Sequence, residues 1–227
     1  MARGHCAQHW RVYVITDVIL ARGRTHEEIA REAIRGGADV IQLRDKQASS
    51  RELYQVALRL RQMTREAGIP LIINDRVGIA LAVDADGVHL GPEDMPADVV
   101  RKLLGPNRIV GVTATNLEQA LQAQQGGADY VGLGPIFESR GLDPDPTKAT
   151  GLELVRQVRQ ALNIPIVAIG GVSLNNVASV IQAGAQTVAA ISAIVTAADI
   201  AERVQEFAQH VQSAMTNCQH PSGEGSS

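Results

Sequence analysis

Cysteine is nearly absent from this sequence, and other features that mark particular classes of protein are missing as well. Two of the 227 residues are cysteines, Cys6 and Cys218, and both lie near an end of the chain. We therefore expect no disulfide framework, and a reducing cytoplasm fits. The formal net charge of −3 gives no broad basic surface that would predict nucleic-acid binding. No apolar run approaches the ~20 residues of a membrane span, and the opening MARGHCAQHW lacks the apolar segment of a signal peptide.

Motifs of several common enzyme classes are missing too. No GxGxxG follows the first apolar run, so a dinucleotide-binding sheet has little support. No Cys/His cluster has zinc spacing, and no GxSxG marks a nucleophile elbow. His5, His9 and His26 lie near the N-terminus or a helix start, and His89 lies within an apolar run. We expect structural roles for these histidines, with His89 packed in a strand.

Short β-branched runs recur eight times along the chain and predict strands over residues 12–17, 39–45, 70–75, 87–91, 108–114, 130–137, 165–171 and 187–194. Several are nearly continuous apolar runs, which is typical of parallel strands covered on both faces. Segments of helical period lie between them, with predicted N-caps at Thr25, Asn116 and Ser173 and glycines at their ends.

This alternation predicts an α/β protein with a single (β/α)8 TIM barrel, and a doubly wound open sheet is the alternative. We expect an N-terminal extension over 1–11, the barrel over 12–214 and a disordered tail over 215–227. In such a barrel the functional groups gather where the strands end, because all these ends open onto one face.

The second predicted strand carries Gln42, Arg44 and Lys46 at alternating positions, which places all three on one face. Two cations in a small volume at the barrel mouth predict a phosphate-binding site. The alternative is ordinary exposed charge at a strand end.

Acidic residues follow the next two strands, as Asn74-Asp75 and Glu93-Asp94. Carboxylates at neighbouring strand ends can share one hard cation such as Mg²⁺, with Asp75 and Asp94 as its ligands. The alternative is that these aspartates are helix N-caps.

The last two strands end in Gly170-Gly171 and Ile191-Ser192. The loops after strands seven and eight commonly hold a phosphate in this fold, using backbone N–H groups and a helix start. Glycine lets the phosphate approach the backbone closely.

The segments VYVITD, GADVIQLRDK, LIINDRVGIALAVDADGVHLGPEDMP, GADYVGLGPIF, PIVAIGGV and ISAI occur in this order. Together they resemble the thiamine phosphate synthase family over nearly the whole chain. The resemblance implies a TIM-barrel transferase. It would join a pyrimidine diphosphate to hydroxyethylthiazole phosphate, or to its carboxylated form, by a dissociative, Mg²⁺-assisted substitution that releases pyrophosphate.

By this resemblance, the pyrimidine diphosphate is bound by Gln42, Leu43, Arg44, Asp45, Lys46, Asn74 and Thr113, the last in place of the family's usual serine. Asp75 and Asp94 would bind the Mg²⁺ cofactor, and Gly171, Ile191 and Ser192 the thiazole phosphate. The resemblance assigns catalytic roles to Arg44 and Lys46. It leaves the oligomeric state open, and a homo-oligomer is compatible with it.

The segment GPIFESRGLDPDPTKATG departs most from the family pattern, which commonly reads GPIFPTxTK. Ser139 can stand for the first threonine, and Lys148 is the candidate for the displaced catalytic lysine, with Arg140 as the rival cation. Because the segment follows the sixth strand, we expect a loop on the functional face and no domain linker.

Two other functions are weighed against the synthase. A thiazole tautomerase shares this pattern but carries histidines where this chain has Pro135 and Thr115. A non-catalytic barrel that binds a phosphate ligand would be marked by an altered catalytic loop.

Overall fold

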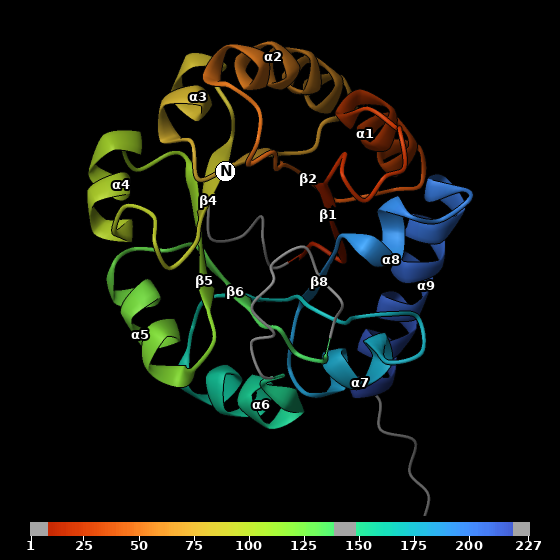
Figure 1. Cartoon of the computed structure of the whole chain (residues 1–227). Helices are drawn as coiled ribbons and strands as arrows, with labels where there is room; N and C mark the ends of the chain where they lie inside the picture. Colours follow the sequence, from red (N-terminus) through yellow and green to blue (C-terminus); the bar gives the residue numbers. More distant parts are fainter. Residues whose placement is uncertain (1–8, 139–148, 220–227) are drawn as a thin grey trace, which may run out of the picture.

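Eight parallel strands close into a barrel with helices around the outside (Figure 1). The computed structural model describes residues 9–138 and 149–219. The strands pair in chain order and β8 returns to pair with β1, so the predicted (β/α)8 barrel is confirmed and the open sheet is wrong. The strands are β1 (Val12–Thr16), β2 (Val40–Leu43), β3 (Leu71–Asn74), β4 (Gly87–Leu90), β5 (Ile109–Ala114), β6 (Tyr130–Leu133), β7 (Ile166–Ala168) and β8 (Thr187–Ala190).

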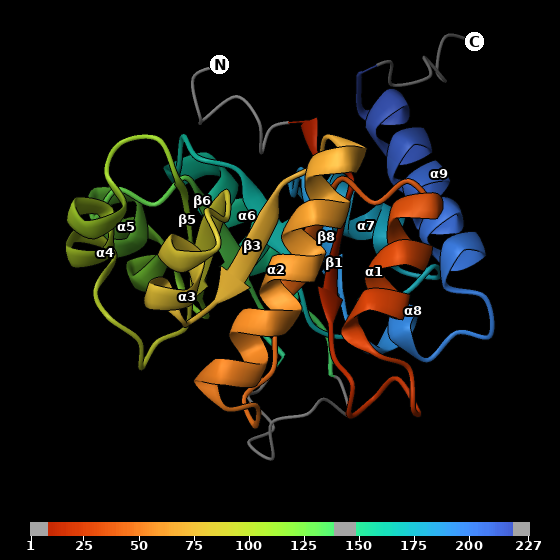
Figure 2. The ribbon, with the colours of Figure 1, turned by 90° about the horizontal axis from the view of Figure 1, so that it is seen from above.

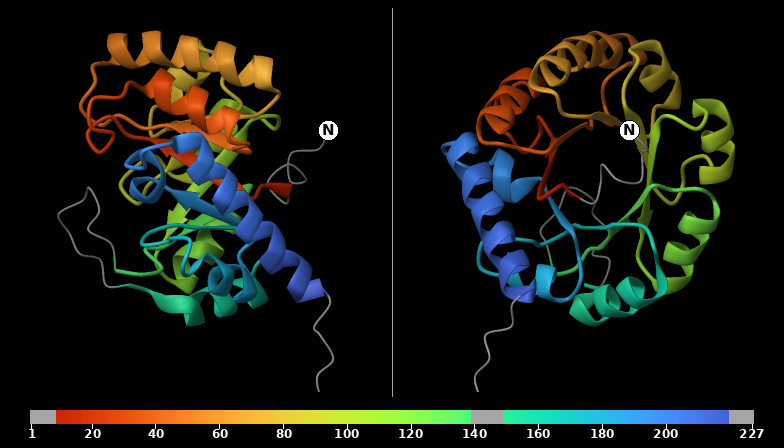
Figure 3. Two further views of the ribbon diagram at one scale, coloured as in Figure 1. Left: turned by 90° about the vertical axis from the view of Figure 1, so that its right-hand side faces the viewer. Right: turned by 180° about the vertical axis from the view of Figure 1, so that it is seen from behind.

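A ring of helices encloses the strands when the barrel is seen from behind (Figure 3). The helices are α1 (His26–Arg35), α2 (Ser50–Ala67), α3 (Val77–Ala82), α4 (Ala97–Leu104), α5 (Leu117–Gln125), α6 (Gly151–Ala161), α7 (Val177–Gln182), α8 (Ser192–Val195) and α9 (Ile200–Gln219). Figure 2 shows α9 beside α1, and α9 also packs on α7. It extends past residue 214, where the sequence placed the end of the barrel. Among the described residues, no helix has the length and apolar character needed to cross a membrane.

Alternate strand residues face two separate apolar layers. The smaller layer contains Tyr13, Ile15, Val40, Ile72 and Tyr130. The strand residues between them belong to the larger layer, which also contains the apolar faces of the helices. Because side chains alternate along a strand, the smaller layer fills the barrel and the larger one lies between strands and helices.

The predicted helix caps are correct at two of three positions. The Thr25 side chain accepts the N–H of Glu28 and forms a capping box at α1. The Asn116 side chain caps α5 by accepting the N–H of Gln119. The prediction for Ser173 is wrong. Its N–H donates to Asn176 Oδ1 within a turn, and α7 begins only after that turn.

Most strands end earlier than the sequence predicted, four of them by two or more residues. β2 stops at Leu43, β6 at Leu133 and β7 at Ala168. β8 stops at Ala190, where Ile191 becomes the N-cap of α8. After β2 the charged residues Arg44 and Asp45 begin the next loop, where Asp45 accepts the N–H groups of Gln47 and Ala48. After the other three strands the apolar run continues, but the residues that follow form a helix cap or irregular backbone bonds, which apolar content alone does not distinguish from a strand.

Candidate active site

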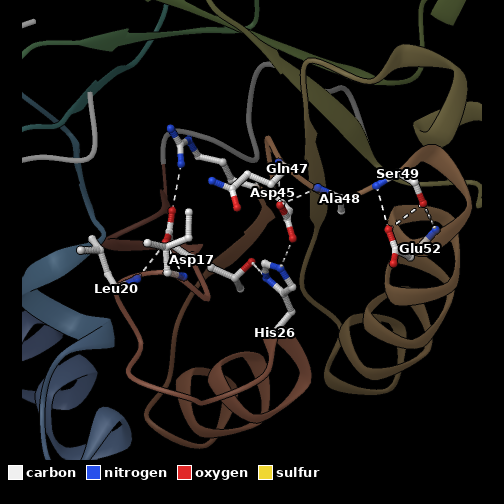
Figure 4. A network of polar contacts seen from close by, with 11 residues as sticks. Asp17, Leu20, His26, Asp45, Gln47, Ala48, Ser49 and Glu52 are labelled. Carbon is white, nitrogen blue, oxygen red and sulfur yellow. Dashed lines mark hydrogen bonds and ion pairs between the residues drawn. The ribbon is translucent and has the colours of Figure 1, made fainter. Parts of the chain in front are cut away.

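A buried ion pair stands at the ends of β1 and β2, where the barrel opens. Arg44 Nη1 lies 2.9 Å from Asp17 Oδ2, and their side chains are 13% and 3% exposed. The other Asp17 oxygen, Oδ1, accepts the N–H groups of Ile19 and Leu20 (Figure 4). The Arg44 guanidinium is therefore held at the mouth by a carboxylate whose own position is fixed by backbone bonds.

Sequence reasoning missed Asp17. The available signal was its place as the polar residue that ends the run VYVITD, the same place that Asp75 has after β3. A cavity of about 130 Å³ lies directly beside the pair and is lined by Asp17, Val18, Ile19, Arg44, Asp45, Lys46 and Gln47. The predicted cationic segment thus borders a concave surface of the size expected for a small polar group.

Asp45 shapes the loop that follows β2. Its Oδ1 accepts the N–H groups of Gln47 and Ala48 at 2.9 Å, and its Oδ2 lies 3.3 Å from His26 Nε2 (Figure 4). The opposite nitrogen of His26, Nδ1, lies 2.7 Å from Thr16 Oγ1. Burial raises the pKa of the Asp45 carboxyl, but the two backbone N–H groups and His26 together bring it below its usual value. His26 is buried and structural, as predicted.

The prediction that one strand face carries Gln42, Arg44 and Lys46 needs a correction. β2 ends at Leu43, so the alternation does not continue to Lys46, which lies exposed on the loop formed by Asp45. Gln42 lies inside the barrel, where its Nε2 donates to the Tyr13 hydroxyl at 2.8 Å. Leu43 packs in the layer between strands and helices, so its side chain faces away from the barrel interior.

Asp75 and Asp94 lie in the loops after β3 and β4. Asp75 Oδ1 accepts from Arg76 Nε at 2.9 Å, and Asp75 Oδ2 accepts from Asn74 Nδ2 at 3.0 Å. Asp94 Oδ2 accepts the N–H of Gly91 at 2.6 Å. Neither aspartate is a helix cap, because α3 and α4 have Arg76 and Pro96 at their N-cap positions without a side-chain bond. The alternative that sequence reasoning left open for these residues is therefore wrong.

The electrostatics of this acidic pair suit a hard cation. Burial is the main cause that raises the pKa of Asp75, and the charge of Asp94 adds to it, while Arg76 and Asn74 oppose it. The charged form is thus disfavoured until positive charge arrives. No group of three or more His, Cys, Asp or Glu side chains that could hold a metal occurs among residues 9–138 and 149–219. Two carboxylates nevertheless fit Mg²⁺, which takes oxygen ligands and usually keeps waters and substrate phosphates as its others.

Thr113 lies at the mouth end of β5, half-buried, with its Oγ1 2.9 Å from His89 Nε2. His89 Nδ1 lies 3.0 Å from the Tyr130 hydroxyl, and the two rings stack at 5.6 Å. His89 is therefore a packed strand histidine, as predicted. Burial lowers its pKa to about 4, so the imidazole is neutral at pH 7. Sequence reasoning missed Tyr13 and Tyr130, whose only signal is their inward position on β1 and β6.

The loops after β7 and β8 lie at the same end of the barrel. Gly171 has a φ of +67°, and a Cβ there would lie 2.7 Å from Phe137 Cβ. Glycine is thus required by the backbone conformation and by the approach of the β6 loop, apart from any ligand. Ile191 is partly buried against the barrel interior, and Ser192 begins α8.

The segment after β6 is anchored at both of its described ends, the first end to the residues that follow β7 and the second end to the start of the segment itself. The N–H groups of Ile136 and Phe137 donate to the carbonyls of Ile169 and Gly170, and Thr150 donates to Pro135 O through both its N–H and its hydroxyl. A domain linker is excluded, because β6 and β7 pair within one barrel. The predicted residues Ser139 and Lys148, and the rival Arg140, lie outside the described residues.

The fold, with charged and polar side chains in the loops at the carboxyl ends of its strands, defines a TIM-barrel class of enzyme whose sites lie on that face. The family model "Thiamine monophosphate synthase" matches residues 12–194, and the chain belongs to this family. The family and the transferase activity expected from the sequence are thereby confirmed.

Individual relatives agree with this assignment. The chain is 51% identical over 198 residues to the thiamine-phosphate synthase of Chloroflexus aurantiacus, covering 87% of this chain and 91% of the relative. It is 45% identical over 211 residues to that of Natronomonas pharaonis, with coverage of 92% and 99%. The solved structure of thiamine phosphate pyrophosphorylase from Pyrococcus furiosus superposes with a TM-score of 0.84 at 41% identity, covering 92% of this chain and 98% of that one.

Proposed function

We propose that this protein is a thiamine-phosphate synthase that joins 4-amino-2-methyl-5-(diphosphooxymethyl)pyrimidine to hydroxyethylthiazole phosphate, or to its carboxylated form. The products are thiamine phosphate and pyrophosphate. The observation that carries the proposal is a barrel mouth that holds both a fixed cation, Arg44 on buried Asp17, and an acidic pair, Asp75 and Asp94. We expect the enzyme to act in the cytoplasm, and a homo-oligomeric state is compatible with this role.

The bond that breaks joins the pyrimidine methylene carbon to the diphosphate oxygen, and its electron pair leaves with pyrophosphate. The bond that forms joins the resulting methylene cation to the lone pair of the thiazole nitrogen. In this dissociative order, negative charge grows on the leaving group before the new bond is made. Arg44 and Lys46 would stabilise that charge, and a fixed cation does so without reorganising at the moment of reaction. No general base is needed, because the thiazole nitrogen carries no proton to remove.

Asp75 and Asp94 would hold Mg²⁺, with Asn74 beside them and orienting Asp75 through its amide. When bound, Mg²⁺ supplies positive charge to the departing pyrophosphate. The carboxylates fix where that charge lies relative to Arg44.

The remaining site residues divide between the two substrates. Gln42 and Thr113 would contact the pyrimidine diphosphate, together with Ser139 and Lys148 from the loop after β6. Gly171, in the loop after β7, and Ile191 and Ser192, at the start of α8, would hold the thiazole phosphate through their backbone. Two substrates held on two sides of one mouth gain rate mainly from proximity and orientation.

Pyrophosphate release from both substrates with Mg²⁺ tests the function. Absence of release above background from the folded protein would refute it, and conversion of the thiazole tautomer without Mg²⁺ would indicate the tautomerase instead. Asp75→Asn should lower kcat/KM by about 100-fold. Asp84→Asn is a matched control, because Asp84 has the same left-handed φ of 53° and lies exposed. An equal loss of kcat/KM in both variants would contradict the assignment of Asp75 as a metal ligand.

Comparison of Lys148→Ala with Arg140→Ala tests which cation of the loop serves the reaction. We expect turnover to fall in the lysine variant, and the assignment fails if the arginine variant alone is impaired.

A further inference from the structure

A chain of five polar side chains crosses the interior of the barrel and connects two of the proposed substrate contacts. Gln42 Nε2 lies 2.8 Å from the Tyr13 hydroxyl, which lies 2.8 Å from the Tyr130 hydroxyl. The Tyr130 hydroxyl lies 3.0 Å from His89 Nδ1, and His89 Nε2 lies 2.9 Å from Thr113 Oγ1. Gln42 and Thr113 thus stand at the two ends of one hydrogen-bonded path.

The chemistry of the donors gives this path a direction. A side-chain amide nitrogen can only donate, so Gln42 donates to the Tyr13 oxygen. Tyr13 has one hydroxyl proton, and its other partner is Tyr130, so Tyr13 donates to Tyr130. Tyr130 in turn has one proton left to give, and His89 Nδ1 receives it.

The proton of His89 must then lie on Nε2. A neutral imidazole carries one proton, and the nitrogen that accepts a hydrogen bond is the one without it. His89 Nε2–H donates to Thr113 Oγ1, which leaves the Thr113 hydroxyl proton available to the barrel mouth. Burial keeps the side chains of the path uncharged, which preserves the direction of its hydrogen bonds. It raises the pKa of Tyr13 and Tyr130 above the usual value and lowers that of His89, so all three stay neutral at pH 7.

Close packing holds the rings in this arrangement. A Cβ at Gly132 would lie 2.8 Å from His89 Cε1, and a Cβ at Gly111 would lie 2.0 Å from Tyr130 Cζ. Trp10 contacts Tyr13 and Tyr130 edge-on with centroids 5.9 and 5.7 Å away. The rings fill the space that these two glycines leave, so a different ring orientation would require repacking of the interior.

We propose that His89 is a positioning residue that fixes Thr113 as a hydrogen-bond donor to the pyrimidine diphosphate. The identity of the substrate rests on the proposed function, whereas the tautomer of His89 does not. A donor at this point selects a substrate atom that accepts, such as a diphosphate oxygen or an unprotonated ring nitrogen. It disfavours an analogue that presents N–H there, because two donors would face each other.

The tautomer is measured directly by ¹⁵N chemical shifts and two-bond couplings of histidine in the free, labelled protein at pH 7. We expect a single Nε2–H tautomer for His89. Observation of Nδ1–H would overturn the proposal, because that state requires the Gln42 oxygen to face Tyr13 and reverses every donor along the path. A charged imidazolium would overturn it as well.

Kinetics test the positioning role. Tyr130→Phe removes the hydroxyl that donates to His89 Nδ1 without touching substrate and should raise KM for the pyrimidine diphosphate about 10-fold, with KM for the thiazole phosphate unchanged. Tyr54→Phe, on α2 outside the barrel, is the matched control. Thr113→Ser should retain near wild-type KM, and Thr113→Val should not. Equal effects of Tyr130→Phe on both substrates would indicate a purely structural role and overturn the assignment.

The two proposals can fail separately. An Nε2–H tautomer in a protein that releases no pyrophosphate would refute the synthase function and support the tautomer assignment. Normal pyrophosphate release with an Nδ1–H tautomer would support the synthase function and refute the tautomer assignment.

Discussion

The burial of His89 predicts a specific loss of stability in acid. In the folded protein its pKa is about 4, because burial disfavours the imidazolium, whereas the unfolded value is near 6.5. Below about pH 6.5 the unfolded chain therefore binds a proton that the folded protein does not. The resulting stability is fully present above the unfolded pKa and is lost as the pH falls toward the folded one.

The size of the effect follows from the two pKa values. Their separation corresponds to a loss of about 1.2 kcal/mol at pH 5.5 and about 3 kcal/mol at pH 4, relative to pH 7. Asp75 acts in the opposite direction, because its pKa is raised in the folded state and its protonation in acid favours folding. A variant that lacks only the imidazole keeps the contribution of Asp75, so the difference in the free energy of unfolding between the wild type and this variant reports His89 alone.

Urea unfolding of the wild type and of His89→Gln at pH 7, 5.5 and 4 measures the difference. Glutamine keeps a donor and an acceptor but does not titrate in this range, so the free energy of unfolding of the variant should depend less on pH. We expect the wild type to lose about 3 kcal/mol more than the variant between pH 7 and pH 4. If the free energy of unfolding depends on pH equally in the two proteins, His89 is not held neutral by burial and the reasoning is refuted.

Two further substitutions test the charge and packing of the site, and a third in α3 serves as a comparison. Asp17→Asn should lower the free energy of unfolding by about 3 kcal/mol and raise KM for the pyrimidine diphosphate, because Arg44 loses its buried partner. An unchanged KM in a variant that urea unfolding shows to be folded would contradict the role of Asp17 in holding Arg44 for the substrate. Gly132→Ala should lower stability by about 1–3 kcal/mol through contact with His89. Gly78→Ala in α3, where nothing lies within 4 Å, should raise stability by about 0.5–1 kcal/mol, and thermal unfolding compares the two.

The positions of the site residues along the chain could be predicted because they follow strand ends. Asp75 comes directly after an apolar run and Asp94 lies in the loop that follows the next one, and in a barrel all such places open onto one face. The exact end of a strand was harder to predict. Lys46 was assigned to a strand face because apolar alternation does not show where Asp45 begins to bind the backbone of the next turn.

Contacts between distant parts of the chain could not be predicted at all. Tyr13 and Tyr130 are 117 residues apart, and their hydroxyls meet because β1 and β6 both face the barrel interior. No local pattern distinguishes an inward tyrosine that joins a polar path from one that only fills space. The same holds for Asp17, whose pairing with Arg44 depends on β1 lying next to β2.

The sequence by itself determined the order of strands and helices, the barrel that this order closes, and the motifs that identify the family. These follow from local periodicity and short segments, which depend on neighbouring residues. The tertiary structure alone decided which side chains pair and which face inward. Such relations arise only when strands far apart in the chain are brought within hydrogen-bonding distance.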